Sequence, residues 1–130
     1  MADHGLMLYG NAIIVNTDYA KANPGMVKKF LVAVGAGWKD AIKDPKAAAV
    51  ALVKRNPAAD AALEQRRLQL AIDANVLTDY VKSNGMGGID SARFGAAIKQ
   101  LSETYDYKVT PEPSLYFTDA YLPSGGISLN

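Results

Sequence analysis

The sequence has 130 residues, of which 49% are hydrophobic, and its 14 Lys and Arg nearly balance its 13 Asp and Glu, for a net charge of +1. This length predicts one domain, which as a compact unit would bury about two-thirds of its unfolded surface. The lack of a basic excess argues against nucleic-acid binding, which depends on clustered Lys and Arg. The absence of Cys excludes disulfides, thiolate metal sites and cysteine nucleophiles.

The chain begins with a segment that is typical of a buried strand. Residues 8–15 are apolar and become β-branched towards their end, ahead of the polar turn Asn16-Thr17-Asp18. A strand needs neighbours, and residues 1–7 are too short to supply them. We therefore expect the chain to be a fragment. Residues 1–5 also lack the basic region and apolar core of a signal peptide, and no apolar run reaches the ~18 residues of a membrane span.

A long helix is predicted over residues 24–43. Asn23-Pro24 is a typical helix start, because Asn can cap and Pro at the first helical position lacks only an N–H that would be unsatisfied anyway. Apolar residues then recur at helical spacing on one face. This face comprises Val27, Phe30, Leu31, Val34, Trp38 and Ile42.

Further helices are predicted along the rest of the chain. The pairs Asp44-Pro45 and Asn56-Pro57 indicate helix starts, with helices over residues 45–55 and 58–75. In the second helix we expect Leu63, Leu70 and Ala74 to share one stripe, with Leu68 and Ile72 beside it. Three glycines within residues 84–88 predict a loop, and Asp90 is predicted to cap a helix that reaches Tyr105. In the tail, we expect one short turn over residues 117–122 and a frayed end over residues 124–130.

The candidate binding residues are Tyr9, Gly10 and Asn11, at the head of the predicted strand. Glycine permits close approach of a ligand to the backbone, and the Asn amide offers both a donor and an acceptor. The alternative is that this tripeptide is a hairpin or an edge position of a sheet. His4 has no spaced partner that would make a metal site. The glycine loop fits neither a P-loop nor a dinucleotide fingerprint.

No set of residues supports catalysis. The carboxylates fall on predicted helix caps or solvated faces, and the serines have no base in view. We therefore expect a protein that is not an enzyme and that holds no cofactor or metal.

The order of these motifs resembles the C-terminal part of ABC-importer solute-binding proteins of the NMT1/THI5-like group, which is similar to nitrate-, sulfonate- and taurine-binding proteins. The motifs are residues 5–15, the pairs Asn23-Pro24, Gly37-Trp38 and Asp44-Pro45, and residues 88–94. The resemblance implies a mainly α fold with one or two strands, the C-terminal part of a type II periplasmic-binding-protein α/β lobe. Residues 1–130 would then be a single partial domain, in which the crossover strand 8–15 precedes a helical bundle.

The resemblance also implies a function. The chain would belong to the ligand-binding component of an ABC importer, with a thiamine pyrimidine precursor, a sulfonate or nitrate as solute, and with a permease as partner. The full-length protein would be periplasmic or extracellular, and residues 9–11 would lie where the returning crossover strand passes the ligand cleft. A free-standing helical interaction module is the alternative. As an isolated chain we expect a homodimer, because a strand without partners exposes backbone groups that can pair with another copy.

Overall fold

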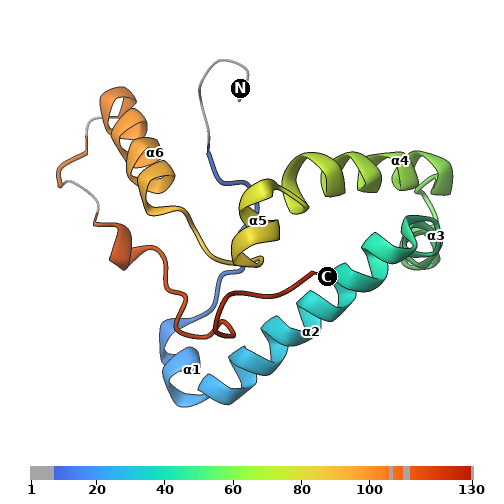
Figure 1. Ribbon diagram of the computed structural model, residues 1–130, viewed down its shortest axis with the longest axis horizontal. Coiled ribbons are helices and arrows are strands. Elements are labelled where there is room, and N and C mark those ends of the chain that lie inside the picture. The colour runs from blue at the N-terminus through green and yellow to red at the C-terminus, as the bar shows by residue number, and fades with distance from the viewer. Residues whose placement is uncertain (1–7, 106, 110–111, 130) are drawn as a thin grey trace.

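The computed structural model describes residues 8–105, 107–109 and 112–129 (Figure 1). Helices hold 64% of these residues, and the described part contains no strand, only an isolated antiparallel bridge between Met86 and Ile127. The prediction of a mainly helical chain is confirmed. The periplasmic-binding-protein lobe stays a prediction.

The described elements follow one another in a simple order. They are α1 (Thr17–Ala22), α2 (Pro24–Lys43), α3 (Pro45–Arg55), α4 (Ala61–Ala71), the π-helical turn η2 (Ile72–Val76), α5 (Asp79–Asn84), α6 (Ser91–Thr104) and the 3₁₀ turn η3 (Pro113–Leu115). The bounds predicted for α2 and α3 are confirmed. The predicted α6 is confirmed as well, while α5 falls in a stretch to which no element was assigned.

Proline sets the starts of α2 and α3, but the two caps differ. The Asp44 carboxylate accepts the Ala47 N–H at 2.9 Å, as a side-chain cap should. Asn23 makes no such bond to α2, and its side-chain amide instead donates to the Tyr19 carbonyl at 3.2 Å. Asn23 therefore finishes α1, and α2 begins on Pro24 without a side-chain cap.

The predicted start of the following helix at Asn56-Pro57 is wrong. The carbonyl of Asn56 accepts the Ala59 N–H at 3.0 Å in a turn, and α4 begins only at Ala61. Asp60 supplies the cap, with its carboxylate accepting the Leu63 N–H at 2.7 Å. The N–H groups in the first turn of a helix have no partner within the helix. Asp60 precedes Leu63 by three residues, so its carboxylate can accept the Leu63 N–H, and this bond favours a helix that begins after Asp60.

The apolar side of α4 also differs from the prediction. Leu70 is 69% exposed and Leu63 is exposed as well, whereas Ile72 is buried and Leu68 is half-buried. The stripe expected to face the core is therefore turned outward. The α-helix ends at Ala71, and the π-helical turn η2 extends the helical structure to Val76. The predicted end near Asn75 is therefore confirmed if η2 is counted with α4, although the last turn is not α-helical.

The predicted strand over residues 8–15 is not present in the structure. Residues 8–16 have no regular secondary structure, and no described segment lies beside them as a partner. A strand is defined by hydrogen bonds to a neighbouring strand, so an apolar, β-branched segment alone does not form one.

The C-terminal segment docks on the helices rather than fraying. Met86 and Ile127 exchange two backbone hydrogen bonds, of 2.8 and 2.9 Å. The Ile127 side chain is buried against Gly35 of α2, where an added Cβ would collide with it. The expectation of a frayed end is therefore wrong for this residue. Gly35 of α2 leaves room for the Ile127 side chain, and Gly85 leaves room for the preceding Gly125 and Gly126.

The helices bury few side chains for a chain of this length. Six hydrophobic residues are buried in the described part: Ala20, Val27, Ala49, Ile72, Ala97 and Ile127. The accessible surface is 9794 Å², whereas a compact monomer of 13.9 kDa exposes about 6,700 Å². The chain thus buries about half of its unfolded surface and not the expected two-thirds. The cause is visible in Figure 1, where helices α1 to α4 pack on their neighbours in sequence and the whole remains open.

Candidate functional site

Tyr9 is the one residue of the predicted tripeptide that the structure fixes in place. Its hydroxyl accepts the backbone N–H of Asp90 at 2.7 Å. Its ring meets the Phe94 ring edge-on, with centroids 6.1 Å apart, and the guanidinium carbon of Arg93 lies 4.3 Å from the Tyr9 ring centroid. Edge-to-face rings and a cation over a ring face are both favourable geometries. The N-terminal segment is therefore clamped to the start of α6.

Arg93 holds the main chain next to this ring. Its Nη2 donates to the carbonyl of Leu8 at 2.7 Å, and its backbone N–H donates to the Asp90 carboxylate at 2.7 Å. The second bond is the ordinary N-terminal cap of α6. Because Asp90 caps the helix, it orients the first turn, and this turn presents Arg93 to the N-terminal segment. We call Tyr9, Asp90, Arg93 and Phe94 the α6 clamp.

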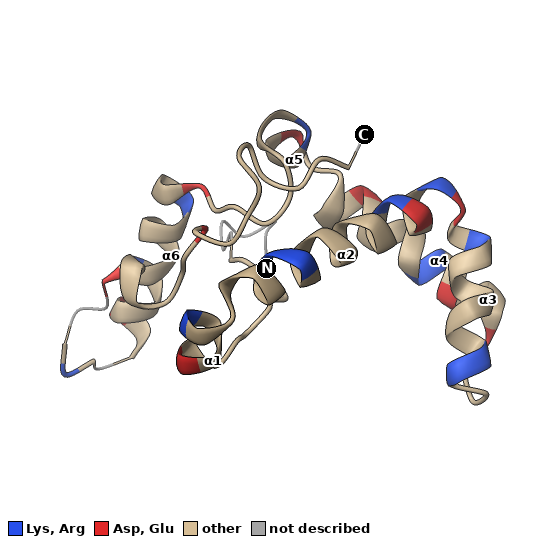
Figure 2. Ribbon diagram, turned by 90° about the horizontal axis from the view of Figure 1, so that it is seen from below, with Lys and Arg blue, Asp and Glu red and all other residues tan. Residues whose placement is uncertain are grey.

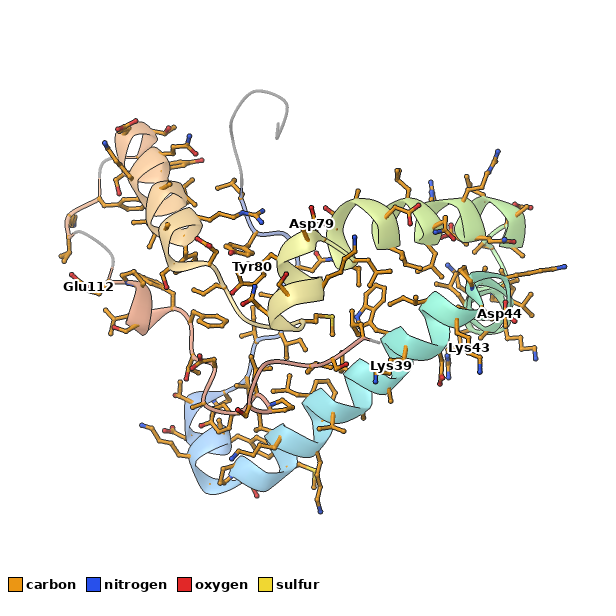
Figure 3. All side chains as sticks on the ribbon, viewed as in Figure 1. Lys39, Lys43, Asp44, Asp79, Tyr80 and Glu112 are labelled. Carbon is orange, nitrogen blue, oxygen red and sulfur yellow. The ribbon has the colours of Figure 1, made fainter. Side chains whose placement is uncertain are left out.

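Tyr80 of α5, labelled in Figure 3, lies close enough to Tyr9 and Asp90 of the clamp for their charges to act on its hydroxyl. Burial raises the pKa of Tyr80 above its usual value of 10.0, and the negative charges that Tyr9 and Asp90 can carry add to the effect. A Cβ added at Gly88 would stand 3.6 Å from the Tyr80 hydroxyl, an ordinary contact distance. The loop before α6 therefore passes close to this hydroxyl without crowding it.

Gly10 and Asn11 are exposed and lie outside the clamp. A Cβ added at Gly10 would meet nothing within 4 Å. The assignment of Tyr9, Gly10 and Asn11 to ligand binding stays a prediction. Of the three, Tyr9 is the residue with a hydrogen bond and ring contacts to another described element. The sequence reading assigned Asp90 to a cap and Phe94 to an apolar stripe. It gave Arg93 and Tyr80 no role, since nothing local signals that they lie near Tyr9, which is more than 70 positions away from each in the sequence.

Two hollows lie away from the tripeptide. One, of about 170 Å³, is found between α5 and the C-terminal segment, and Val81, Gly85 and Gly125 are among its lining residues. The other is an open groove of about 1,020 Å³ along α2, α3 and α4, with Ala48 and Leu52 in its walls. Its rim carries the charged residues Asp40, Asp44, Arg55 and Glu64. Three carboxylates against one guanidinium make this rim unfavourable for an anionic solute.

Other chemistry can be checked only within the described residues. There, no group of three or more His, Asp or Glu side chains is close enough to hold a metal ion. His4 lies outside the described residues. None of the helices in the described part combines the length and the apolar character needed to span a bilayer.

A family model described as NMT1/THI5 like matches residues 1–48. This family comprises substrate-binding proteins of ABC transporters, which are typically periplasmic or extracellular. The matched range includes the tripeptide, α1, α2 and the first turn of α3, whereas the α6 clamp partners of Tyr9 lie beyond it. No curated protein and no solved structure matches the chain significantly.

Proposed function

We propose that the chain is the C-terminal part of the solute-binding component of an ABC importer and has no catalytic activity of its own. The observation that carries this proposal is the NMT1/THI5-like match over residues 1–48, which contains the tripeptide. The solute is a small organic molecule or an oxyanion, such as a thiamine pyrimidine precursor, a sulfonate or nitrate. The partners are this solute and the permease of the importer, not nucleic acid, and the location is periplasmic or extracellular.

The α6 clamp supports a binding role for the residues that follow Tyr9. Because the Tyr9 hydroxyl and ring are engaged by Asp90, Arg93 and Phe94, the next two residues leave the clamp from a fixed point. Gly10 has open space around its Cα, and the Asn11 amide is exposed. An amide with one acceptor and two donor hydrogens suits either the edge of a pyrimidine or the oxygens of an oxyanion.

The chain supplies only part of a binding site in this proposal. Small-molecule sites usually enclose about 300–1,000 Å³ and bury most of the ligand. The hollow of about 170 Å³ is smaller than this, and the groove on α2, α3 and α4 is open and rimmed by carboxylates. We infer that a further α/β segment provides the facing wall of the site near residues 9–11.

The test uses the complete translated protein that contains this sequence. A thermal-shift screen against pyrimidines, sulfonates and oxyanions should identify one stabilising class, and calorimetry then gives its Kd. Asn11→Ala should raise Kd about fivefold for each hydrogen bond lost. Asn75→Ala, at an exposed position of η2, is the matched control and should leave Kd unchanged. Equal affinities of the two variants would remove Asn11 from the site, and the absence of any stabilising solute would contradict the proposal.

A free-standing helical interaction module remains the second candidate. The exposed apolar side chains of this chain favour that candidate, because they could contact a partner protein. The coding sequence upstream of Met1 separates the two. An in-frame α/β segment preceded by a signal peptide supports the importer component. A start codon at Met1 without importer genes nearby would favour the interaction module.

A further inference from the structure

The backbone of residues 10–15 is held at its two ends and unbonded between them. On one side, the Leu8 carbonyl accepts from Arg93. On the other side, the Asn16 carbonyl accepts the Ala20 N–H and the Asn16 side chain caps α1. No hydrogen bond joins the backbone of residues 10–15 to any residue that the structure describes. Six consecutive residues with free N–H and C=O groups are as long as a typical strand.

The side chains of this segment are apolar and exposed. Ile14 is 93% exposed and Ile13 is 53% exposed, and both are β-branched residues that favour strands. Successive residues of a strand point to opposite faces, so both faces of the segment would be apolar. The sequence from Leu8 to Thr17 contains no charged residue and no proline. Such residues are the devices by which natural edge strands avoid pairing with other chains, and this segment has none of them.

The chain exposes enough surface to accommodate a partner of its own size. It exceeds that of a compact monomer of the same mass by about 3,000 Å². Each subunit of an obligate dimer buries about 1,000–2,500 Å². Exposed apolar side chains continue beyond the segment at Tyr19 of α1 and at Met26 and Phe30 of α2. Repulsion between two copies is small, since the net charge is +1 and both signs are interspersed over the helices (Figure 2).

We propose that two copies of this 130-residue chain form a dimer in which residues 10–15 of each copy pair as antiparallel strands across a two-fold axis. A two-fold axis brings the same surface of both subunits together, so the segment of one copy can pair with the same segment of the other. It satisfies backbone groups on both copies and covers Ile13 and Ile14. The pairing concerns the 130-residue chain by itself, because in the complete importer component the further α/β segment would occupy the same residues. The proposal goes beyond the solute-binding function and does not rest on it.

The first experiment measures the mass of the chain by light scattering after size exclusion, at several protein concentrations. The wild type should have twice the mass of the 13.9 kDa chain, and its melting temperature should rise with concentration. Ile14→Lys should raise the dimer dissociation constant at least tenfold. This side chain is almost fully exposed, so the variant should fold normally. Leu70→Lys, on the exposed side of α4, is the matched control and should remain dimeric.

A second experiment locates the interface. Because the chain has no Cys, Ile14→Cys gives a single thiol that a short bismaleimide should cross-link between two copies, whereas Leu70→Cys should not be cross-linked. Amide hydrogen exchange of residues 10–15 should be slow in the wild type and fast in Ile14→Lys. A monomer at all concentrations, a dimer unaffected by Ile14→Lys, or open-ended growth of the assembly would each overturn the proposal. Slow exchange of residues 10–15 in a monomer would likewise overturn it, since the chain would then cover the segment itself.

Discussion

Tyr9→Phe removes one atom from the α6 clamp and leaves the remaining contacts in place. The lost hydroxyl accepts the Asp90 N–H at 2.7 Å, while the ring can keep its edge-on contact with Phe94 and its place under Arg93. A neutral hydrogen bond stabilises a protein by about 1 kcal/mol, and an unpaired, partly buried donor costs about 1–3 kcal/mol. Asp90 is half-buried, and water can therefore reach part of this N–H. We expect Tyr9→Phe to lower the free energy of unfolding by about 1–2 kcal/mol.

Tyr9→Ala should cost more, because the ring contacts are lost together with the hydrogen bond. An aromatic pair contributes about 0.5–1.5 kcal/mol beyond its buried area, and a partly exposed cation–π contact about 0.5–1 kcal/mol. With the hydrogen bond, the expected loss is about 3 kcal/mol. The difference between the Phe and Ala variants thus reports the two ring contacts together with the burial of the ring.

Urea unfolding followed by circular dichroism measures these losses, at one fixed protein concentration so that association does not contribute. The midpoint should shift while the slope with urea stays constant. Tyr105→Phe is the control, since Tyr105 is exposed and ends α6 away from the clamp, and it should change the midpoint little. If Tyr9→Phe and Tyr105→Phe unfold at the same urea concentration, the hydroxyl of Tyr9 does not hold the N-terminal segment to α6, and this reasoning is refuted.

Two further predictions concern the elements around the clamp. Gly85→Ala should lower the free energy of unfolding by about 1–3 kcal/mol, because its φ of 74° and ψ of 165° belong almost only to glycine, and its new Cβ would meet the Gly125 carbonyl oxygen. Gly95→Ala, in open space within α6, should instead stabilise by about 0.5–1 kcal/mol; thermal unfolding that shows the same sign for both would contradict the argument. Tyr80 has a raised pKa in the folded state, so the folded chain holds this proton more tightly than the unfolded chain, and stability should fall as pH rises above about 10. Tyr80→Phe should reduce this alkaline loss, and equal slopes of stability against pH above 10 for the two proteins would disprove it.

Several features of the molecule follow from the sequence because the interactions that create them are local. Pro24 and Pro45 start α2 and α3 where predicted, and Asp90 caps α6 through an N–H only three residues away. The three glycines within residues 84–88 predict a loop, and Gly85 and Gly87 do adopt a positive φ there, directly after α5. Each of these contacts spans at most a few residues, so the periodicity and the capping residues contain the necessary information. The same local reasoning placed Tyr9 at the head of the segment predicted to bind a ligand, but it could not say what Tyr9 contacts.

Only the tertiary structure decided which distant segments meet. Tyr9 lies 81 positions from Asp90, and Met86 lies 41 positions from Ile127, so no periodicity along the chain records either contact. The predicted strand over residues 8–15 shows the opposite case. Its composition is suited to a strand, yet hydrogen bonds to a neighbouring strand are absent among the described residues, and without them the segment stays irregular. A helix closes its own hydrogen bonds within four residues, whereas a strand depends on a partner that its own sequence does not contain.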